Sequence, residues 1–134
     1  MSARPIAIAL ALLAAIFCSG CGAADRADDA TAVAHVFQSA LDAKDGQKAC
    51  AQLSDQTASS LEQDEGRPCE DAILDVDLPT ATAVPRARVY VTSAAVELDG
   101  GALFLDESPG GWQISAAGCK PTEPDMPFDC ELED

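Results

Sequence analysis

Residues 86–119 read RARVYVTSAAVELDGGALFLDESPGGWQISAAGC, and this stretch decides the fold because apolar residues alternate along it. A period of two predicts β-strands with one buried face. The inward sets are Ala87, Val89 and Val91; Ala94, Val96 and Leu98, continued by Leu103 and Leu105; and Trp112, Ile114 and Ala116. Asp99-Gly100 and the run SPGG at 108–111 predict tight turns between these strands. We therefore expect an antiparallel meander.

A last strand is predicted near the C-terminus. After the proline-rich crossing 121–127, the residues Phe128, Cys130 and Leu132 alternate with acidic side chains. Charge beside an apolar row is typical of an edge strand.

Before residue 86 the period is helical. Val33, Val36, Phe37, Ala40 and Leu41 share one face of a helix that we expect to begin near Ala30, capped by Asp28 or Asp29, and to end at Asp45-Gly46. Three short helical stretches are expected next: 47–53, one capped by Ser54 and running to Glu65, and one begun by Pro68. Helices followed by a meander predict an α+β fold, with one domain over residues 30–134.

The N-terminus has the layout of a signal peptide over residues 1–20. An apolar run of 13 residues, Pro5–Phe17, follows a short charged start. As a helix it would span about 20 Å, too little for the hydrocarbon core of roughly 30 Å. The segment Cys18–Cys21 (CSGC) resembles a bacterial lipobox, which implies a diacylglyceryl group on Cys21 and a polar tether over 21–29. Cleavage after Ala24 with release into the medium, or an uncleaved anchor, are the alternatives.

The chain after residue 20 is strongly acidic. It carries 7 basic against 23 acidic residues, a formal charge of −16. Such a surface repels phosphate, which argues against nucleic acid as a partner and against charge-driven adsorption to a membrane. We expect the acidity to serve solubility, with attraction of a basic partner as the alternative.

Four further cysteines, Cys50, Cys69, Cys119 and Cys130, give an even count typical of disulfides in an exported protein. Three pairings are possible. Spacing favours Cys50 with Cys69 and Cys119 with Cys130, because each pair brackets a turn-rich stretch. A metal site is disfavoured since the chain has no C-x-x-C pair, and a redox pair of Cys50 and Cys69 is a less favoured alternative to a structural bridge.

Two stretches, 49–78 and 111–133, carry a family resemblance. The paired cysteines, the Trp before a strand ending in Ala-Ala-Gly-Cys, and Phe128 two positions before the last Cys are similar to features of small actinobacterial lipoproteins of unassigned role. That resemblance implies a nuclear-transport-factor-2-like (cystatin-like) fold, in which a curved antiparallel sheet wraps around an N-terminal helix. The cone between helix and sheet often holds an apolar pocket in that fold, for which His35, Tyr90 and Trp112 are our candidate lining residues.

Catalytic patterns are lacking in the sequence. Enzymes of that fold, such as isomerases and dehydratases, need a base with a shifted pKa inside the pocket. His35 lies on the flank of the helical stripe, and Tyr90 shares the outer strand face with Arg86 and Arg88. Asp75 and Asp77 lack the spacing of an EF-hand loop. We find no nucleophile elbow and no phosphate-binding glycine loop, and we expect no cofactor and no metal.

The sequence thus favours a lipid-anchored, non-enzymatic binding protein on the extracytoplasmic face of the plasma membrane, with an unknown protein or small ligand as partner. An isomerase- or dehydratase-type enzyme using His35 or a buried Asp is the alternative, and a spacer role is a third. An apolar cavity of at least about 300 Å³ with a buried titratable group would favour the enzyme, whereas a filled cone would favour binding through the surface.

Overall fold

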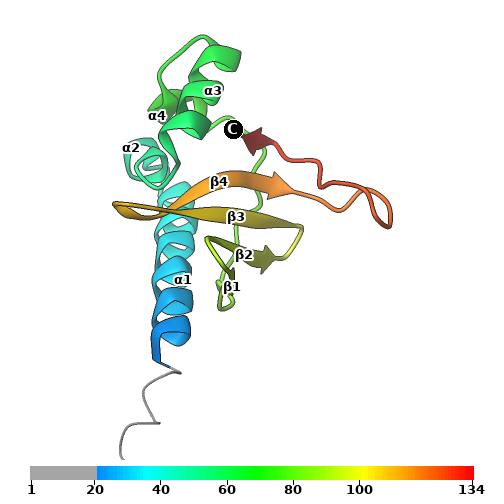
Figure 1. The fold of residues 1–134 in the computed structure, drawn as a ribbon. Coiled ribbons are helices and arrows are strands. Elements are labelled where there is room, and N and C mark those ends of the chain that lie inside the picture. The colour runs from blue at the N-terminus through cyan, green and yellow to red at the C-terminus, as the bar shows by residue number, and fades with distance from the viewer. Residues whose placement is uncertain (1–20) are drawn as a thin grey trace, which may run out of the picture.

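The computed structural model describes residues 21–134; the expected signal peptide lies outside them. The described chain folds into four helices and one five-stranded antiparallel sheet (Figure 1), so the α+β prediction is confirmed. The elements are α1 (Cys21–Asp42), α2 (Gly46–Cys50), α3 (Asp55–Glu65), α4 (Cys69–Ala72), β1 (Arg88–Tyr90), β2 (Ser93–Leu98), β3 (Gly101–Ser108), β4 (Gly111–Cys119) and β5 (Leu132–Glu133). The long helix α1 runs along the stack of strands, and the three short helices gather near its C-terminal end.

The sheet is a meander in the order β1-β2-β3-β4-β5. Leu98 pairs with Gly101 and Ser108 with Gly111, so both predicted turns are confirmed as two-residue connections. Ala94, Val96, Leu103, Leu105 and Ile114 are all buried, as the alternation predicts. This meander supplies the face against which α1 packs.

Two predicted inward positions are wrong. Val91 is 87% exposed because β1 ends at Tyr90 and Val91 lies in the following turn. Ala116 is only partly buried, while Ala117 is fully buried, because the pairing of β4 with β3 shifts twice. Leu105 pairs with Ile114, but Phe104 pairs with Ala116, so one extra residue in β4 exchanges the inward and outward sets.

The final strand is also shorter than predicted. Only Leu132 and Glu133 form β5, and Leu132 pairs with Ala117. Asp129 makes an isolated bridge with Lys120 instead of continuing that strand.

Helix α1 begins at Cys21 in place of the tether expected over 21–29, and neither Asp28 nor Asp29 caps it. The buried residues Ala27, Ala30, Ala34, Phe37 and Leu41 recur every three or four positions, so the stripe begins six residues before the predicted Val33. Val33 and Val36, which were predicted to lie on it, are only half-buried at its flank. Alanine is the strongest helix former, which favours this extension.

The core lies between α1 and the inner face of the sheet. Phe37 of α1 packs in one cluster with Val96, Leu103, Leu105 and Ile114, and each of them is at most 1% exposed. Burying a side chain of this size stabilises the fold by about 1.5–3 kcal/mol. Around Phe37 the space between α1 and the sheet is therefore filled by side chains.

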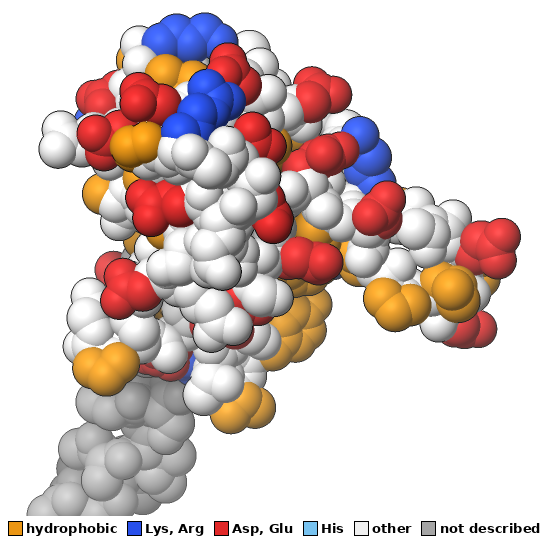
Figure 2. Space-filling view, turned by 90° about the horizontal axis from the view of Figure 1, so that it is seen from above, with side chains coloured by type: hydrophobic (Ala, Val, Ile, Leu, Met, Phe, Trp, Pro, Cys, Tyr) orange, Lys and Arg blue, Asp and Glu red, His pale blue; other side chains and the backbone are white. Residues whose placement is uncertain are grey.

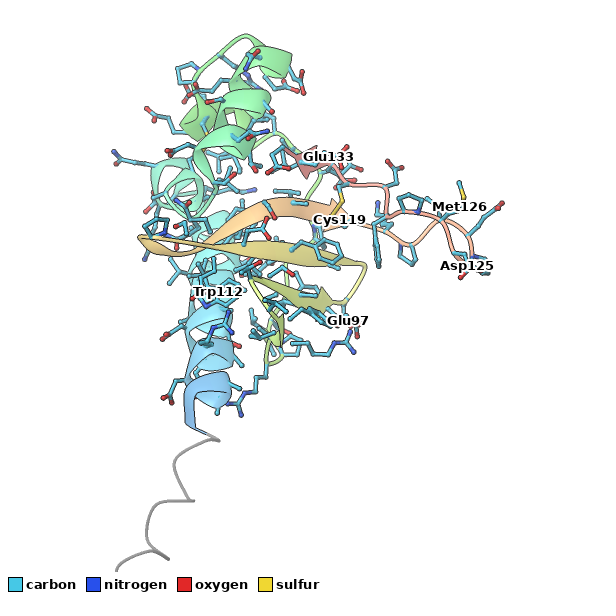
Figure 3. All side chains as sticks on the ribbon, in the orientation of Figure 1. Glu97, Trp112, Cys119, Asp125, Met126 and Glu133 are labelled. Atoms are coloured by element: carbon cyan, nitrogen blue, oxygen red, sulfur yellow. A yellow bond between two sulfur atoms is a disulfide. The ribbon has the colours of Figure 1, made fainter. Side chains whose placement is uncertain are left out.

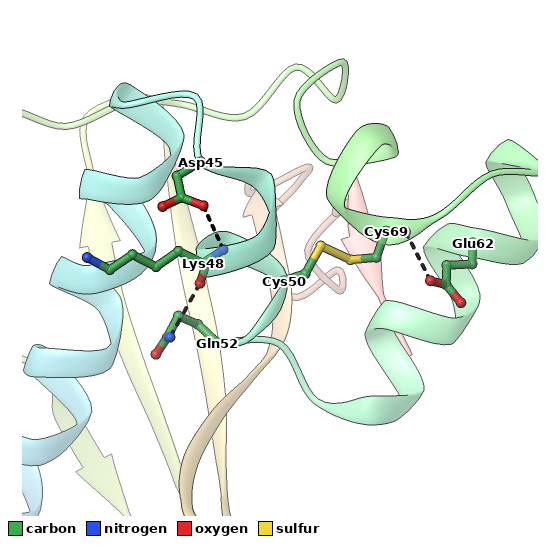
Figure 4. Close-up of a disulfide and its surroundings, with 6 residues drawn as sticks. All are labelled: Asp45, Lys48, Cys50, Gln52, Glu62 and Cys69. Atoms are coloured by element: carbon green, nitrogen blue, oxygen red, sulfur yellow. Dashed lines mark hydrogen bonds between the residues drawn. A yellow bond between two sulfur atoms is a disulfide. The ribbon is translucent and has the colours of Figure 1, made fainter.

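Both favoured disulfides are present. Cys50–Cys69 joins α2 to α4 (Figure 4), and Cys119–Cys130 closes the proline-rich crossing. Ser54 caps α3, as predicted, by accepting a hydrogen bond from the Thr57 N–H, and Gly66 ends it with a left-handed φ of 66°. Pro68 is the cap of α4 instead of its first residue.

Helices α2 and α4 come very close beside the first disulfide. A Cβ added at Gly46 would lie 1.8 Å from the carbonyl oxygen of Glu70. Glycine at residue 46 therefore allows a backbone approach that no other residue permits without movement.

Candidate functional site

A groove lies on the face of the sheet that α1 leaves uncovered. It consists of two adjoining hollows of about 250 Å³ and 450 Å³, which share Glu97, Ala102 and Phe128 in their lining. We call it the outer groove and define it by Tyr90, Ala95, Glu97, Ala102, Phe104 and Phe128.

Small residues form the floor of the outer groove. Ala95 pairs with Phe104 across β2 and β3, and Glu97 pairs with Ala102 in the next outward row. Because alanine and Gly101 stand beside long or aromatic side chains, the surface is hollow along these two rows.

Aromatic rings form the wall. The rings of Phe104 and Phe128 meet edge to face, with centroids 5.2 Å apart. The Cys119–Cys130 disulfide holds Phe128 in place together with two backbone hydrogen bonds between Lys120 and Asp129, of 2.8 Å and 3.0 Å. The second disulfide thus shapes the groove as well as closing the loop.

Polar groups stand at the rim. Arg88 and Glu97 form an ion pair, and their side chains are 60% and 72% exposed. Tyr90 is 55% exposed beside them. The arrangement offers an apolar, partly aromatic surface bordered by a neutralised charge pair, which suits an apolar ligand or side chain.

The three candidate pocket residues do not come together. Tyr90 lines the outer groove, whereas Trp112 is 8% exposed and lies beside α1 at the other end of the strands from Glu97 (Figure 3). The guanidinium of Arg26 stands 5.4 Å from the Trp112 ring and pairs with Glu107. His35 is exposed on α1.

Arg26 and Trp112 line a second, more polar hollow of about 480 Å³ between α1 and the β3–β4 turn. Arg26 already donates to the carbonyl oxygen of Val91 and to Glu107. Its charge is therefore engaged within the protein.

Five of the six groove residues were not predicted from the sequence, namely Ala95, Glu97, Ala102, Phe104 and Phe128. The alternation alone indicates that Ala95 is outward, and a small residue at such a position is the one signal that could have marked the floor. No local signal places Phe128 over Phe104, because the two residues are 24 positions apart.

Few polar side chains are buried in the described chain. Between residues 21 and 134 the buried polar side chains are Gln38, Thr57 and Ser115, and none of them is acidic or basic. The hydrogen bond to Asp75 raises the pKa of Arg67, although both side chains lie near the exposed α3–α4 connection, away from the groove. In the same range no group of three or more His, Cys, Asp or Glu could hold a metal ion.

No helix within residues 21–134 has the length and apolar character needed to cross a membrane. Acidic side chains are spread over the end of the molecule seen in Figure 2, and few basic ones lie among them.

Comparison of the chain with protein-family models, curated proteins and solved structures found no match. The resemblance to small actinobacterial lipoproteins and to the nuclear-transport-factor-2-like fold therefore stays a prediction. The structure itself establishes an α+β architecture with a five-stranded antiparallel sheet and two disulfides.

Proposed function

We propose that the protein is an exported binding protein, anchored by a lipid at Cys21 to the extracytoplasmic face of the plasma membrane. Its domain is proposed to be nuclear-transport-factor-2-like, with α1 inside the curve of the sheet. Two disulfides support an oxidising compartment, since such bridges are rare in the cytosol. The apolar run and the lipobox-like segment before Cys21 support the anchor.

The outer groove is the proposed binding site, and its ligand is an apolar small molecule or an apolar side chain of a partner protein. The observation that carries this proposal is the pair of Phe104 and Phe128 standing over a floor of Ala95 and Ala102. Exposed aromatic surface costs solubility unless it is used, so its concentration over a hollow favours a binding role.

We propose binding without catalysis because the described residues bury no acidic or basic side chain that could act as a general acid or base. His35 is exposed, and no Asp is among the buried side chains of residues 21–134. The packed core between α1 and the sheet supports binding through the surface.

The anchor is tested by the intact mass of the protein isolated from its native membranes. We expect a chain beginning at Cys21 with a diacylglyceryl group, gaining four hydrogen atoms when the two bridges are reduced. Cys21→Ala should move the protein into the medium. A full-length chain with Met1 and free thiols would overturn the proposal.

The groove is tested with N-phenyl-1-naphthylamine, a neutral probe whose fluorescence rises in apolar sites. Phe128→Ala removes part of the wall and should weaken probe binding about tenfold, which corresponds to about 1.4 kcal/mol. Ala95→Leu fills the floor and should abolish binding. Met126→Ala is the matched control, because Met126 is 58% exposed on the same loop and does not line the groove. Equal probe binding by all four proteins, or none by the parent, would refute the site.

A further inference from the structure

We propose that the β1 edge of the sheet rests on the phospholipid headgroups of the membrane, so that the domain stands in one fixed orientation and does not swing on a tether. We define the β1 edge as residues 86–91. The inference rests on the proposed lipid at Cys21.

Helix α1 links the lipidated residue rigidly to the β1 edge. The helix begins at Cys21, so no extended segment separates the anchor from the domain. Four contacts then hold the N-terminal half of α1 against the β1 edge. Arg86 donates to the carbonyl oxygen of Ala24 at 3.2 Å and pairs with Asp28 at 2.9 Å.

The other two contacts engage the backbone of the β1 edge. The Ala87 N–H donates to the Thr31 hydroxyl at 2.8 Å, and Arg26 donates to the Val91 carbonyl oxygen at 2.5 Å. Both ends of the β1 edge are therefore closed by side chains of α1. Addition of a partner strand is disfavoured there, which leaves the exposed side chains as the contact surface.

The rise of the helix limits how far Ala24 and Arg26 can lie above the lipid-bearing Cys21. At about 1.5 Å per residue, Ala24 lies about 4.5 Å and Arg26 about 7.5 Å along the axis from Cys21. A tilt of α1 brings both residues closer to the membrane plane. The headgroup layer of one leaflet is about 5–8 Å thick, so the backbone of Ala24 and Arg26 lies within it, and the contacts of these residues with Arg86 and Val91 place the β1 edge beside it.

The side chains of the β1 edge fit a headgroup layer. Among residues 21–134 the exposed large hydrophobic residues are Tyr90, Val91, Met126 and Phe128, and the first two lie here, with Val91 87% exposed. Tyrosine is enriched at membrane interfaces, and arginine can extend along them. Arg86 and Arg88 are paired with Asp28 and Glu97, so the contact does not depend on anionic lipid.

The test places a tryptophan at the proposed contact. Lipidated protein carrying Val91→Trp is reconstituted in phosphatidylcholine vesicles whose acyl chains are brominated near the headgroup. We expect a blue-shifted spectrum and at least twofold quenching after subtraction of the Trp112 signal from the parent protein. Met126→Trp is the matched control on the projecting loop and should stay unquenched (Figure 3).

A second variant separates orientation from attachment. Ten Gly and Ser residues inserted between Gly22 and Ala23 keep the anchor but remove the rigid link, so Val91→Trp should lose its quenching while the protein still sediments with vesicles. Absence of quenching in protein whose lipid is verified by mass would overturn this inference alone. Absence of the lipid would overturn the proposed anchor and the inference with it.

Discussion

Replacing Gly46 with alanine has two opposite effects on the free energy of unfolding. Helix propensity favours alanine by up to about 1 kcal/mol. The new Cβ would stand 1.8 Å from the Glu70 carbonyl oxygen, whereas real Cβ atoms essentially never approach closer than 3.0 Å. Helices α2 and α4 would have to separate by more than 1 Å, although Cys50–Cys69 ties them together. Overpacking costs about 1–3 kcal/mol or more, and the upper end applies here because the atom that the Cβ meets belongs to the backbone. After the gain in helix propensity, we expect a net loss of about 2 kcal/mol.

Urea unfolding followed by Trp112 fluorescence measures this loss, since Trp112 is the single tryptophan. A loss of this size corresponds to a Tm lower by roughly 8 °C. Gly110→Ala is the control, because its Cβ would meet only the Ser108 hydroxyl at 3.8 Å. If Gly46→Ala were as stable as the parent or more stable, the close approach of α2 and α4 would be refuted. In a chain that also carries Cys50→Ala and Cys69→Ala, α4 is freer to move, so the cost of Gly46→Ala should fall.

Two further stability changes follow from the same region. Removing the first bridge with Cys50→Ala and Cys69→Ala frees a loop of 19 residues and should lower the free energy of unfolding by about 3 kcal/mol in urea titrations; a loss under about 1 kcal/mol would contradict the constraint. Ser54→Ala removes the acceptor of the Thr57 N–H and should cost about 1 kcal/mol in thermal unfolding, while Ser59→Ala on the exposed side of α3 should leave stability nearly unchanged.

The strands were predictable wherever a single period governed them. Within each of β2, β3 and the first part of β4, buried residues alternate with outward ones, as a half-buried strand requires. The buried members are Ala94, Val96, Leu103, Leu105 and Ile114. The pattern failed at Ala116 because a bulge depends on the pairing partner and has no signal in its own strand. The start of α1 was missed because Ala27 and Ala30 are small and mark a buried stripe only faintly.

The candidate site was less predictable than the fold. The even cysteine count indicated two bridges, and spacing favoured the pairing that the structure has. However, the spacing of Cys119 and Cys130 does not indicate which face of the sheet Phe128 covers. Tyr90 was a candidate from its outward position, whereas His35 and Trp112 lie outside the outer groove.

The sequence alone shows that the chain is acidic, has an even number of cysteines, and places helices before strands, because composition and local periodicity depend on neighbouring residues. Only the tertiary structure decided that α1 reaches back to Cys21, that α2 and α4 meet at Gly46, and that Phe128 stands over Phe104. These features depend on contacts between segments far apart in the chain, and such contacts exist only after the core has packed.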